Sequence, residues 1–476
     1  MKGLPRHSAD RMIPSSRIRY QVLLLACLLS ALTYLDRACF GVAAPTIVDE
    51  FGLDSVADLK WAITAFAIAY GLFEVPTGWW GDRFGPRKVL IRIVLWWSFF
   101  TVLTGLAGWK VAGITLGGLT FLILVRFMFG AGEAGAFPNI ARALQNWFPP
   151  AERARAQGLV WMSARLMGGL TPLLWTFLVA GTSLMGPLLT WRQAFFVFGL
   201  LGLLWCLIFA RRFRDRPEQH PLVNDQERAH ILAGRQPGLQ HAPVPWLSVL
   251  FQRNLVCLYL MYFCITYGWY FNMTYLPACL EKRYGVDPSD IFGAIMKGGP
   301  LWLGALGCLL GGLLTDALLR RGASLRWSRQ LPGFVGIVLC SICYFVASSM
   351  PSAWSFALAI SLAAFFNDFV IGGAWATCQD VGGKHTAVVA GVMNTAASAG
   401  AAIAGWFSGV VLDRALNAKA RLLDSTVSEL SLADRTAALV VGYETNLLIF
   451  AATTAVAAIV WLGANAERRL PERESA

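Results

Sequence analysis

Residues 78–88 read Gly-Trp-Trp-Gly-Asp-Arg-Phe-Gly-Pro-Arg-Lys and follow directly on a long apolar segment. Gly78 lets a neighbouring helix approach closely, and Gly85 permits a tight turn. Asp82 is placed to pair with a cation at a helix end. The stretch is therefore typical of a short basic loop between two packed helices.

A degenerate copy of this stretch follows another apolar segment. Residues 312–322 read Gly-Leu-Leu-Thr-Asp-Ala-Leu-Leu-Arg-Arg-Gly, with Asp316 at the place of Asp82. Two copies at matching positions indicate that the chain has two related halves. The alternative is that each stretch is only a basic loop that sets the membrane topology.

Composition places the chain among membrane proteins. Of its 476 residues, 56% are hydrophobic and 14% are charged, whereas a soluble domain carries about 25% charged residues. The apolar residues form long blocks separated by short basic stretches, which excludes a soluble enzyme, a disordered chain and a fibrous protein. The chain has a net charge of +12, and its basic residues alternate with the apolar blocks. This arrangement indicates orientation in a bilayer rather than nucleic-acid binding.

The apolar blocks predict twelve membrane-spanning helices, since a helix needs roughly 20 apolar residues to cross a core of about 30 Å. The first six are expected at 20–45, 61–81, 89–108, 117–140, 157–182 and 191–210. The second six are expected at 252–280, 291–318, 330–349, 353–378, 386–412 and 440–463. The predicted fold is an all-α membrane protein with two pseudo-symmetric six-helix bundles.

Two longer polar stretches interrupt the apolar blocks. The first is rich in proline and charge, and it predicts a linker at 211–250 between bundles at 1–210 and 251–476. The second, 413–445, is mixed in charge and is expected on the opposite side of the membrane. Its Leu-Ala-Asp-Arg-Thr run is compatible with a short surface helix.

Charge asymmetry predicts the orientation. Basic residues gather before the first helix and after the second, fourth, sixth and eighth: Lys2, Arg6, Arg11, Arg17, Arg19, Arg83, Arg87, Lys88, Arg142, Arg153, Arg211, Arg212, Arg320 and Arg321. By the positive-inside rule, both termini are then cytoplasmic. Without a eukaryotic targeting or glycosylation pattern, we expect a bacterial inner membrane.

Ionisable residues lie inside two of the predicted helices, where a charge is costly and by default indicates function. Asp36 and Arg37 are adjacent in the first helix, and Arg126 and Glu133 lie two turns apart in the fourth. Two acids and two bases predict a proton site coupled to an anion site. The alternative is a closed set of structural ion pairs.

These residues carry a resemblance to a known family. Residues 78–88 resemble, without a gap, the cytoplasmic-loop signature of the major facilitator superfamily. Tyr-x-Asp-Arg at 34–37 and RxxxGxxEAxxxP at 126–138 resemble its anion:cation symporters, which carry sugar acids, phthalate and related anions. The resemblance covers essentially the whole chain, and it implies two bundles that rock around a central cavity.

The resemblance also implies roles for single residues. Arg37 would bind the substrate carboxylate, Asp36 and Glu133 would take protons, and Arg126 would pair with Glu133. Hydrogen bonds to substrate hydroxyls would come from Tyr34, Tyr70 and Asn394. The residues that would hold the halves together on the cytoplasmic side are Gly78, Asp82, Arg83, Gly85, Arg87, Lys88 and Asp316.

The sequence departs from the family pattern at several positions. Glu74 stands where Gln is expected, as a third titratable group or as a neutral acid acting like Gln. Arg165 is an extra cation, either a second anion contact for a more highly charged substrate or a counter-charge to Glu74. Tyr267 and Trp375 are cavity candidates because small or polar residues surround them. The pair 367–368 is either a cavity group or a packing or helix-end feature.

The expected function is proton-driven uptake of an organic carboxylate, such as a hexonate or hexuronate, by a monomer in a lipid bilayer. Alternatives are a proton-independent exchanger of organic anions or organophosphates, and a sensor whose transport is vestigial. The ten cysteines and five histidines are scattered without metal-ligand spacing, so no metal, cofactor or catalytic site is expected.

Overall fold

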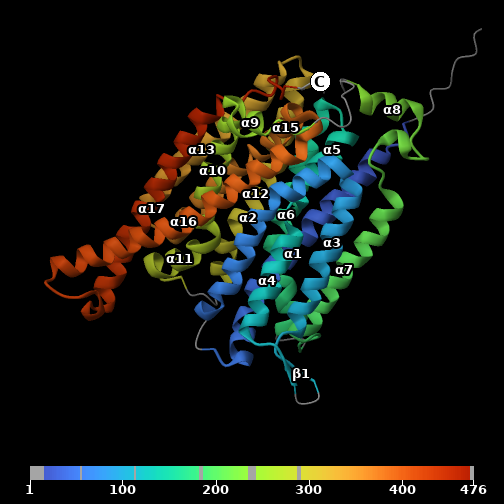
Figure 1. The fold of residues 1–476 in the computed structure, drawn as a ribbon. Helices are drawn as coiled ribbons and strands as arrows, with labels where there is room; N and C mark the ends of the chain where they lie inside the picture. Colours follow the sequence, from blue (N-terminus) through green and yellow to red (C-terminus); the bar gives the residue numbers. More distant parts are fainter. Residues whose placement is uncertain are drawn as a thin grey trace, which may run out of the picture.

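The computed structural model describes residues 15–53, 56–111, 114–181, 186–233, 243–286 and 291–471. The basic residues Lys2, Arg6 and Arg11 and both chain ends lie outside these ranges. Long helices lie side by side along one direction (Figure 1). We call the end that carries the linker helices the linker end, and the end that carries the β-hairpin the hairpin end.

The first half of the chain, the N half, contributes six spanning segments, two of which are interrupted. They are α1 (Ile18–Phe51), α2 (Lys60–Phe84), α3 (Pro86–Leu106), α4 (Leu119–Glu133) with α5 (Ala136–Trp147), α6 (Pro150–Trp175) with the π-turn Thr176–Ala180, and α7 (Trp191–Arg212). The linker carries α8 (Asp225–Leu232) and α9 (Trp246–Phe251).

The second half, the C half, also contributes six spanning segments. They are α10 (Arg253–Thr274) with α11 (Leu276–Tyr284), α12 (Ile291–Arg320), α13 (Leu325–Ser348), α14 (Ala353–Asp368) with α15 (Ile371–Gly382), α16 (Thr386–Leu422) and α17 (Leu432–Trp461). Short 3-10 turns occupy Val56–Leu59, Pro217–Gln219, Gly383–His385 and Val427–Glu429.

The described helices confirm the twelve-helix prediction. Ten stretches are long and apolar enough to span a membrane. One of them, Ala353–Leu422, holds 70 residues and contains both α14–α15 and α16. The helix α2 completes the set, although its polar residues keep it out of those ten.

The chain between the last spans differs from the prediction, although the Leu-Ala-Asp-Arg-Thr run is helical as expected. Most of 413–445 is not a loop, because α16 continues to Leu422 and α17 begins at Leu432. The Leu-Ala-Asp-Arg-Thr run is the start of α17, where Ser431 accepts a hydrogen bond from the Asp434 N–H. An ion pair of 3.1 Å between Lys419 and Asp434 joins the two helices, which project beyond the other helices (Figure 1).

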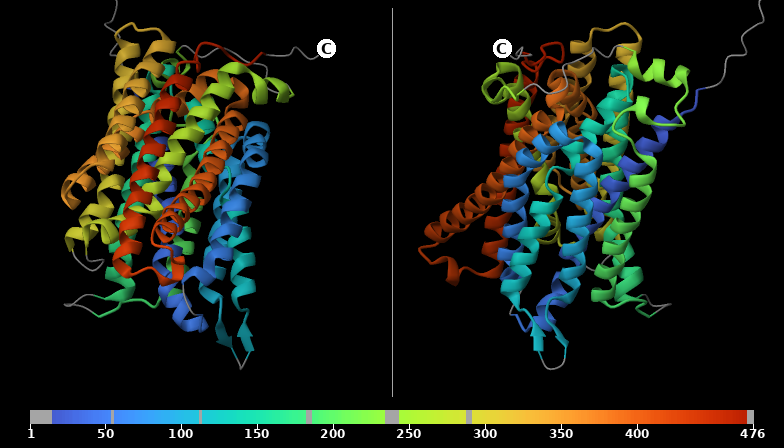
Figure 2. Two further views of the ribbon diagram at one scale, coloured as in Figure 1. Left: turned by 90° about the vertical axis from the view of Figure 1, so that its left-hand side faces the viewer. Right: turned by 45° about the vertical axis from the view of Figure 1, so that its right-hand side comes forward.

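A small β-hairpin between the third and fourth spans was not expected from the sequence. Its strands β1 (Trp109–Val111) and β2 (Ile114–Leu116) pair antiparallel, with Trp109 opposite Leu116. The hairpin lies at the far end of the molecule from α8 in both views of Figure 2.

The two halves approach each other closely along α6 and α12. A Cβ on Gly158 would meet the Cys308 carbonyl, and one on Gly312 would meet the Ala154 carbonyl. Glycine is required at both positions because backbone of the opposite half occupies the space of a side chain.

Candidate functional site

A cavity lies between the two halves, lined by polar and aromatic side chains of both. The N half lines it with Tyr34, Arg37, Tyr70, Trp161 and Arg165. The C half lines it with Tyr262, Ile265, Thr266, Trp269, Asn367, Ile371, Asn394, Ala397, Ser398 and Ala401. Two cations, both from the N half, therefore face one cavity.

Arg37 on α1 reaches a buried carboxylate on α4. Its Nε lies 2.7 Å from Oε1 of Glu133, which is 0% exposed. The guanidinium also lies over the ring of Tyr70, 4.3 Å from its centroid. The Glu133 carboxylate thus fixes the guanidinium of Arg37, and the Arg37 side chain also lines the cavity.

The pairing of Arg126 differs from what the resemblance implied. Among the described residues, Glu133 forms its ion pair with Arg37, and no carboxylate lies at ion-pair distance from Arg126. The Arg126 guanidinium instead lies over the rings of Phe40, Phe66 and Phe129. The turn between α4 and α5 at Ala134 and Gly135 ends α4 at Glu133, where α1 can reach the carboxylate.

Asp36 and Glu74 are buried behind the cavity wall. Asp36 is 4% exposed, and neither residue belongs to the cavity lining. Glu74 on α2 accepts a hydrogen bond of 2.7 Å from Nδ2 of Asn394 on α16, and that amide also donates to the Tyr70 hydroxyl at 3.1 Å. This contact joins the halves beside the cavity.

Arg165 on α6 pairs with Asp368, the last residue of α14. Its Nε and Nη2 donate to the two carboxylate oxygens at 2.6 and 3.1 Å. Its Nη1 donates to the Tyr34 hydroxyl at 2.9 Å, and its guanidinium lies 3.9 Å from the ring centroid of Trp269. The counter-charge to Arg165 is therefore Asp368 and not Glu74.

Two predicted cavity residues lie in packed cores instead. Tyr267 packs against Phe450, and Trp375 is 1% exposed and donates to the Tyr262 hydroxyl at 2.8 Å. Neither lines the cavity.

The residues of α10 that do line the cavity were missed by the sequence analysis. They are Tyr262, Ile265, Thr266 and Trp269. Their spacing of three and four residues places them on one helix face, and Tyr267 falls outside it. This spacing is visible in the sequence, but the sequence alone does not show which face of the helix lines the cavity.

At the linker end, both copies of the loop motif bind a helix of the opposite half. Asp82 of the N half accepts from the N–H groups of Ala387 and Val388 at 3.1 and 2.9 Å, at the start of α16. The backbone of α16 also approaches Gly78 too closely for a side chain there. These N–H groups are free of intrahelical partners, so a carboxylate there caps the helix.

The second copy makes the converse contact. Asp316 of the C half accepts from the N–H groups of Ala154 and Arg155 at 3.3 and 2.8 Å, near the start of α6. It also pairs with Arg329 at 3.0 Å. Each half therefore supplies a carboxylate that accepts from backbone N–H groups of the other.

The remaining motif residues act within the N half or face outward. Arg83 lies over the rings of Trp79 and Phe84. The Arg87 N–H donates to Asp215 at 2.8 Å, and Gly85 adopts φ 88° in the turn. Lys88 is exposed.

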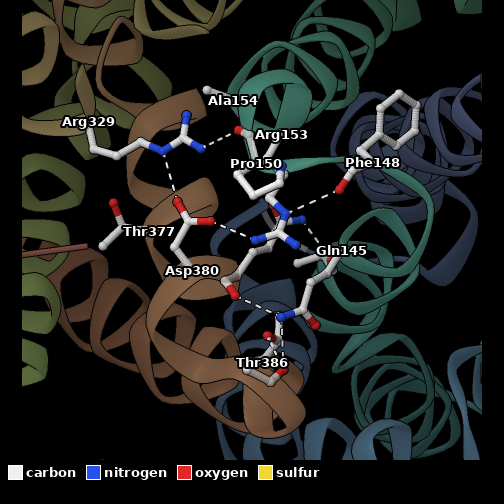
Figure 3. Close-up of polar contacts among 12 residues, drawn as sticks. Gln145, Phe148, Pro150, Arg153, Ala154, Arg329, Thr377, Asp380 and Thr386 are labelled. Atoms are coloured by element: carbon white, nitrogen blue, oxygen red, sulfur yellow. Dashed lines mark hydrogen bonds and ion pairs between the residues drawn. The ribbon is translucent and has the colours of Figure 1, made fainter. Parts of the chain in front are cut away.

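A further polar network at the linker end was not singled out from the sequence. Figure 3 shows Asp380 between Arg329 on one side and Arg153 on the other, with ion pairs of 2.9 and 2.7 Å. Gln145 donates to the backbone carbonyl of Gln379 at 2.7 Å. In the sequence, this network is indicated only by charged residues at the ends of apolar helices.

Metal binding has no candidate group in the part of the chain that the structure describes. No cluster of three or more His, Cys, Asp or Glu side chains is found there.

Comparison with known proteins agrees with the fold. The family model of the Major Facilitator Superfamily matches residues 26–405. The chain is 35% identical to the probable sulfoacetate transporter SauU of Cupriavidus necator, over 83% of this chain and 86% of that one. It is 31% identical to the probable galactarate/D-glucarate transporter GudP of Bacillus subtilis, over 79% and 81%.

A solved structure shows the same fold. The proton:xylose symporter XylE superposes with a TM-score of 0.67 at 14% identity, covering 94% of this chain and 95% of that chain. A polar cavity between two six-helix bundles places the protein in the class of multi-pass membrane carriers. The chain belongs to the Major Facilitator Superfamily, in its anion:cation symporter branch.

Proposed function

We propose that the protein imports an organic carboxylate, such as the sugar acids hexonate or hexuronate, together with protons by alternating access. The observation that carries this proposal is Arg37, a cation in the cavity wall held by the fully buried Glu133. The relatives support an organic anion as cargo, since they are named for sulfoacetate and for galactarate and glucarate.

Proton coupling follows from competition for Arg37. When Glu133 takes a proton its ion pair with Arg37 weakens, and the substrate carboxylate becomes the counter-charge of Arg37. When Glu133 loses that proton it recovers Arg37 and displaces the substrate. Asp36, buried on α1 next to Arg37, is the second candidate proton carrier.

Glu74 has a place in the same scheme. Its hydrogen bond to Asn394 crosses between the halves. Its other oxygen, Oε2, has no hydrogen-bond partner in the described structure. A proton on that oxygen would let Glu74 act as the amide expected at this position.

Orientation follows from charge. The basic residues Arg83, Arg87 and Lys88 lie at the linker end, which the positive-inside rule assigns to the cytoplasm of a bacterial inner membrane. The caps made by Asp82 and Asp316 then close the cytoplasmic side, and release of substrate requires them to separate.

The test is lumenal pH in dye-loaded proteoliposomes of the purified protein, while hexonates, hexuronates, aldarates and aromatic carboxylates are added outside. We expect acidification with one chemical class, lost in Arg37→Ala and retained in the control Arg211→Ala, whose arginine is exposed. Exchange of labelled substrate without acidification would contradict proton coupling. No movement of any anion would contradict the proposal as a whole.

A further inference from the structure

We infer that the substrate carries two anionic groups, and that its second group replaces Asp368 on Arg165 and thereby opens an ion pair between the two halves. This inference rests on the proposed function, and it narrows the cargo of the same cavity from organic carboxylates in general, among which hexonates and hexuronates carry a single carboxylate, to dianions. It concerns a contact in which α6 and α14 come from opposite halves.

Arg165 has the geometry of an occupied anion site. Asp368 takes two of its donors in a bidentate pair, the arrangement that a substrate carboxylate or sulfonate would also adopt. The ring of Trp269 covers its face, and the Tyr34 hydroxyl takes the third nitrogen. The guanidinium is thus oriented before a ligand arrives, with only its counter-ion to be exchanged.

An Arg165–Asp368 ion pair with a purely structural role would be energetically unfavourable at this position. Burying two charges is energetically costly, and apolar residues of similar volume often stabilise a protein as well or better. Arg165 also lines the cavity, where an anionic substrate competes with Asp368 for the same donors. Furthermore, the pair joins halves that must move against each other during transport.

Arg37 and Arg165 both lie close to one aromatic ring, that of Tyr34. Each guanidinium carbon lies 5.9 Å from the ring centroid of Tyr34, so the two are separated by no more than twice that distance. Each is held by one carboxylate, Glu133 at 2.7 Å and Asp368 at 2.6 Å. A short molecule with an anionic group at each end matches both cations at once.

Exchange at Arg165 leaves the site balanced in charge. With Glu133 protonated, the dianion neutralises Arg37 and Arg165, and the displaced Asp368 takes up a proton while keeping the amide of Asn367, now 3.2 Å away. A monoanion at Arg37 leaves Asp368 on Arg165, so the contact between the halves persists. Dianions are therefore the better transported class.

The experiment compares a six-carbon aldarate with the six-carbon aldonate of the same stereochemistry in labelled-substrate counterflow, using the full-length protein in proteoliposomes. We expect the wild type to transport the aldarate roughly tenfold or more better by kcat/KM, the effect of one charged hydrogen-bonded contact. In Arg165→Gln this preference is lost, chiefly through a raised KM for the aldarate. The control Arg211→Gln keeps it.

A paired variant separates binding from folding. Arg165→Gln combined with Asp368→Asn removes both charges, so no unpaired charge stays buried. We expect it to fold, to keep aldonate counterflow measurable and to lack the aldarate preference. Asp368→Asn alone removes the competitor and is expected to lower the aldarate KM.

The outcomes distinguish the two proposals. Transport of both acids with the same ratio in the wild type and in Arg165→Gln overturns this inference and leaves carboxylate transport intact. A wild type that prefers the aldonate overturns it as well. A wild type that moves neither acid overturns the proposed function, and the inference with it.

Discussion

Glu133 illustrates how a single residue can couple a proton to an anion. One of its oxygens accepts from Arg37, and the other, Oε2, has no hydrogen-bond partner in the described structure. A proton can therefore reside on Oε2 without displacing another contact. The residue is also fully buried, so a negative charge on it depends on the ion pair with Arg37.

We predict that Glu133→Gln separates exchange from accumulation. Glutamine keeps the shape but cannot lose a proton, so labelled-substrate exchange should stay within about twofold of wild type while uptake driven by a pH gradient loses the share that is coupled through Glu133. The accumulation ratio should therefore fall by roughly tenfold per pH unit, the contribution of one coupled proton. The measurement is uptake against imposed gradients, with the exposed Glu281→Gln as control. Undiminished accumulation would remove Glu133 from the coupling role.

At the scale of elements, the interrupted helices position the acids. α4 ends at Glu133 and α14 ends at Asp368. The fourth span of each half is therefore interrupted at a carboxylate that pairs with an arginine of the cavity wall. The turn at Ala134 and Gly135 was not predicted from the sequence. The end of a helix places a side chain where a neighbouring helix can approach it, which periodicity within the helix does not reveal.

The linker helix α8 joins the start of α1. Glu227 accepts hydrogen bonds from the backbone N–H groups of Ile18 and Arg19 at 2.8 and 3.0 Å, and from the Ser16 hydroxyl. Burial by itself raises the pKa of Glu227, but these hydrogen bonds and the charge of Arg19 outweigh burial and lower it. The ionised carboxylate is thus preferred in the folded protein.

We predict that Glu227→Gln costs about 1–3 kcal/mol at neutral pH, since a charged acceptor of several hydrogen bonds is lost. A lowered folded-state pKa gives stability that is complete above the ordinary pKa of glutamate and is lost as the pH falls below about 4.3. The difference in Tm between wild type and variant should therefore narrow in acid. Thermal unfolding in detergent from pH 7 to pH 3.5 measures it, with the exposed Glu218→Gln as control. A constant difference would contradict the role of the charge.

The division of the chain into 1–210, 211–250 and 251–476 stays a prediction. The structure adds that α8 and α9 are helical within the linker and that α8 contacts the N half. The linker was predicted from polar composition as a break between apolar blocks, and its short polar helices were not predicted because they lack a strong periodic signal.

At the scale of the whole molecule, the two motif copies make reciprocal contacts between the halves. Asp82 caps α16, Asp316 accepts from two backbone N–H groups of the second turn of α6, and Asp380 lies between Arg153 and Arg329 nearby. All of these contacts are at the linker end, so they stabilise a state in which the halves are joined there.

We predict that Asp82→Asn or Asp316→Asn shifts the molecule toward a state open at the linker end. Loss of a charged cap changes that equilibrium by roughly tenfold or more. Cys308 is fully buried on α12 where α6 approaches, so its alkylation by a membrane-permeant maleimide should accelerate accordingly. Mass spectrometry measures the rate, and Cys340, buried inside the C half, is the internal control. Equal Cys308 rates in wild type and variants would contradict the role of the caps.

The sequence by itself determined the membrane class, the twelve spans, the two related halves and the family, because each depends on local composition or on a contiguous motif. It also located the charges within the membrane-spanning helices: Asp36, Arg37, Glu74, Arg126, Glu133 and Arg165. Tertiary structure decided their partners. Arg37 and Glu133 are 96 residues apart in the chain, and Arg165 and Asp368 are 203 apart. Which side chains meet, and which face of α10 lines the cavity, depends on how helices from distant parts of the chain pack, and no local pattern encodes that.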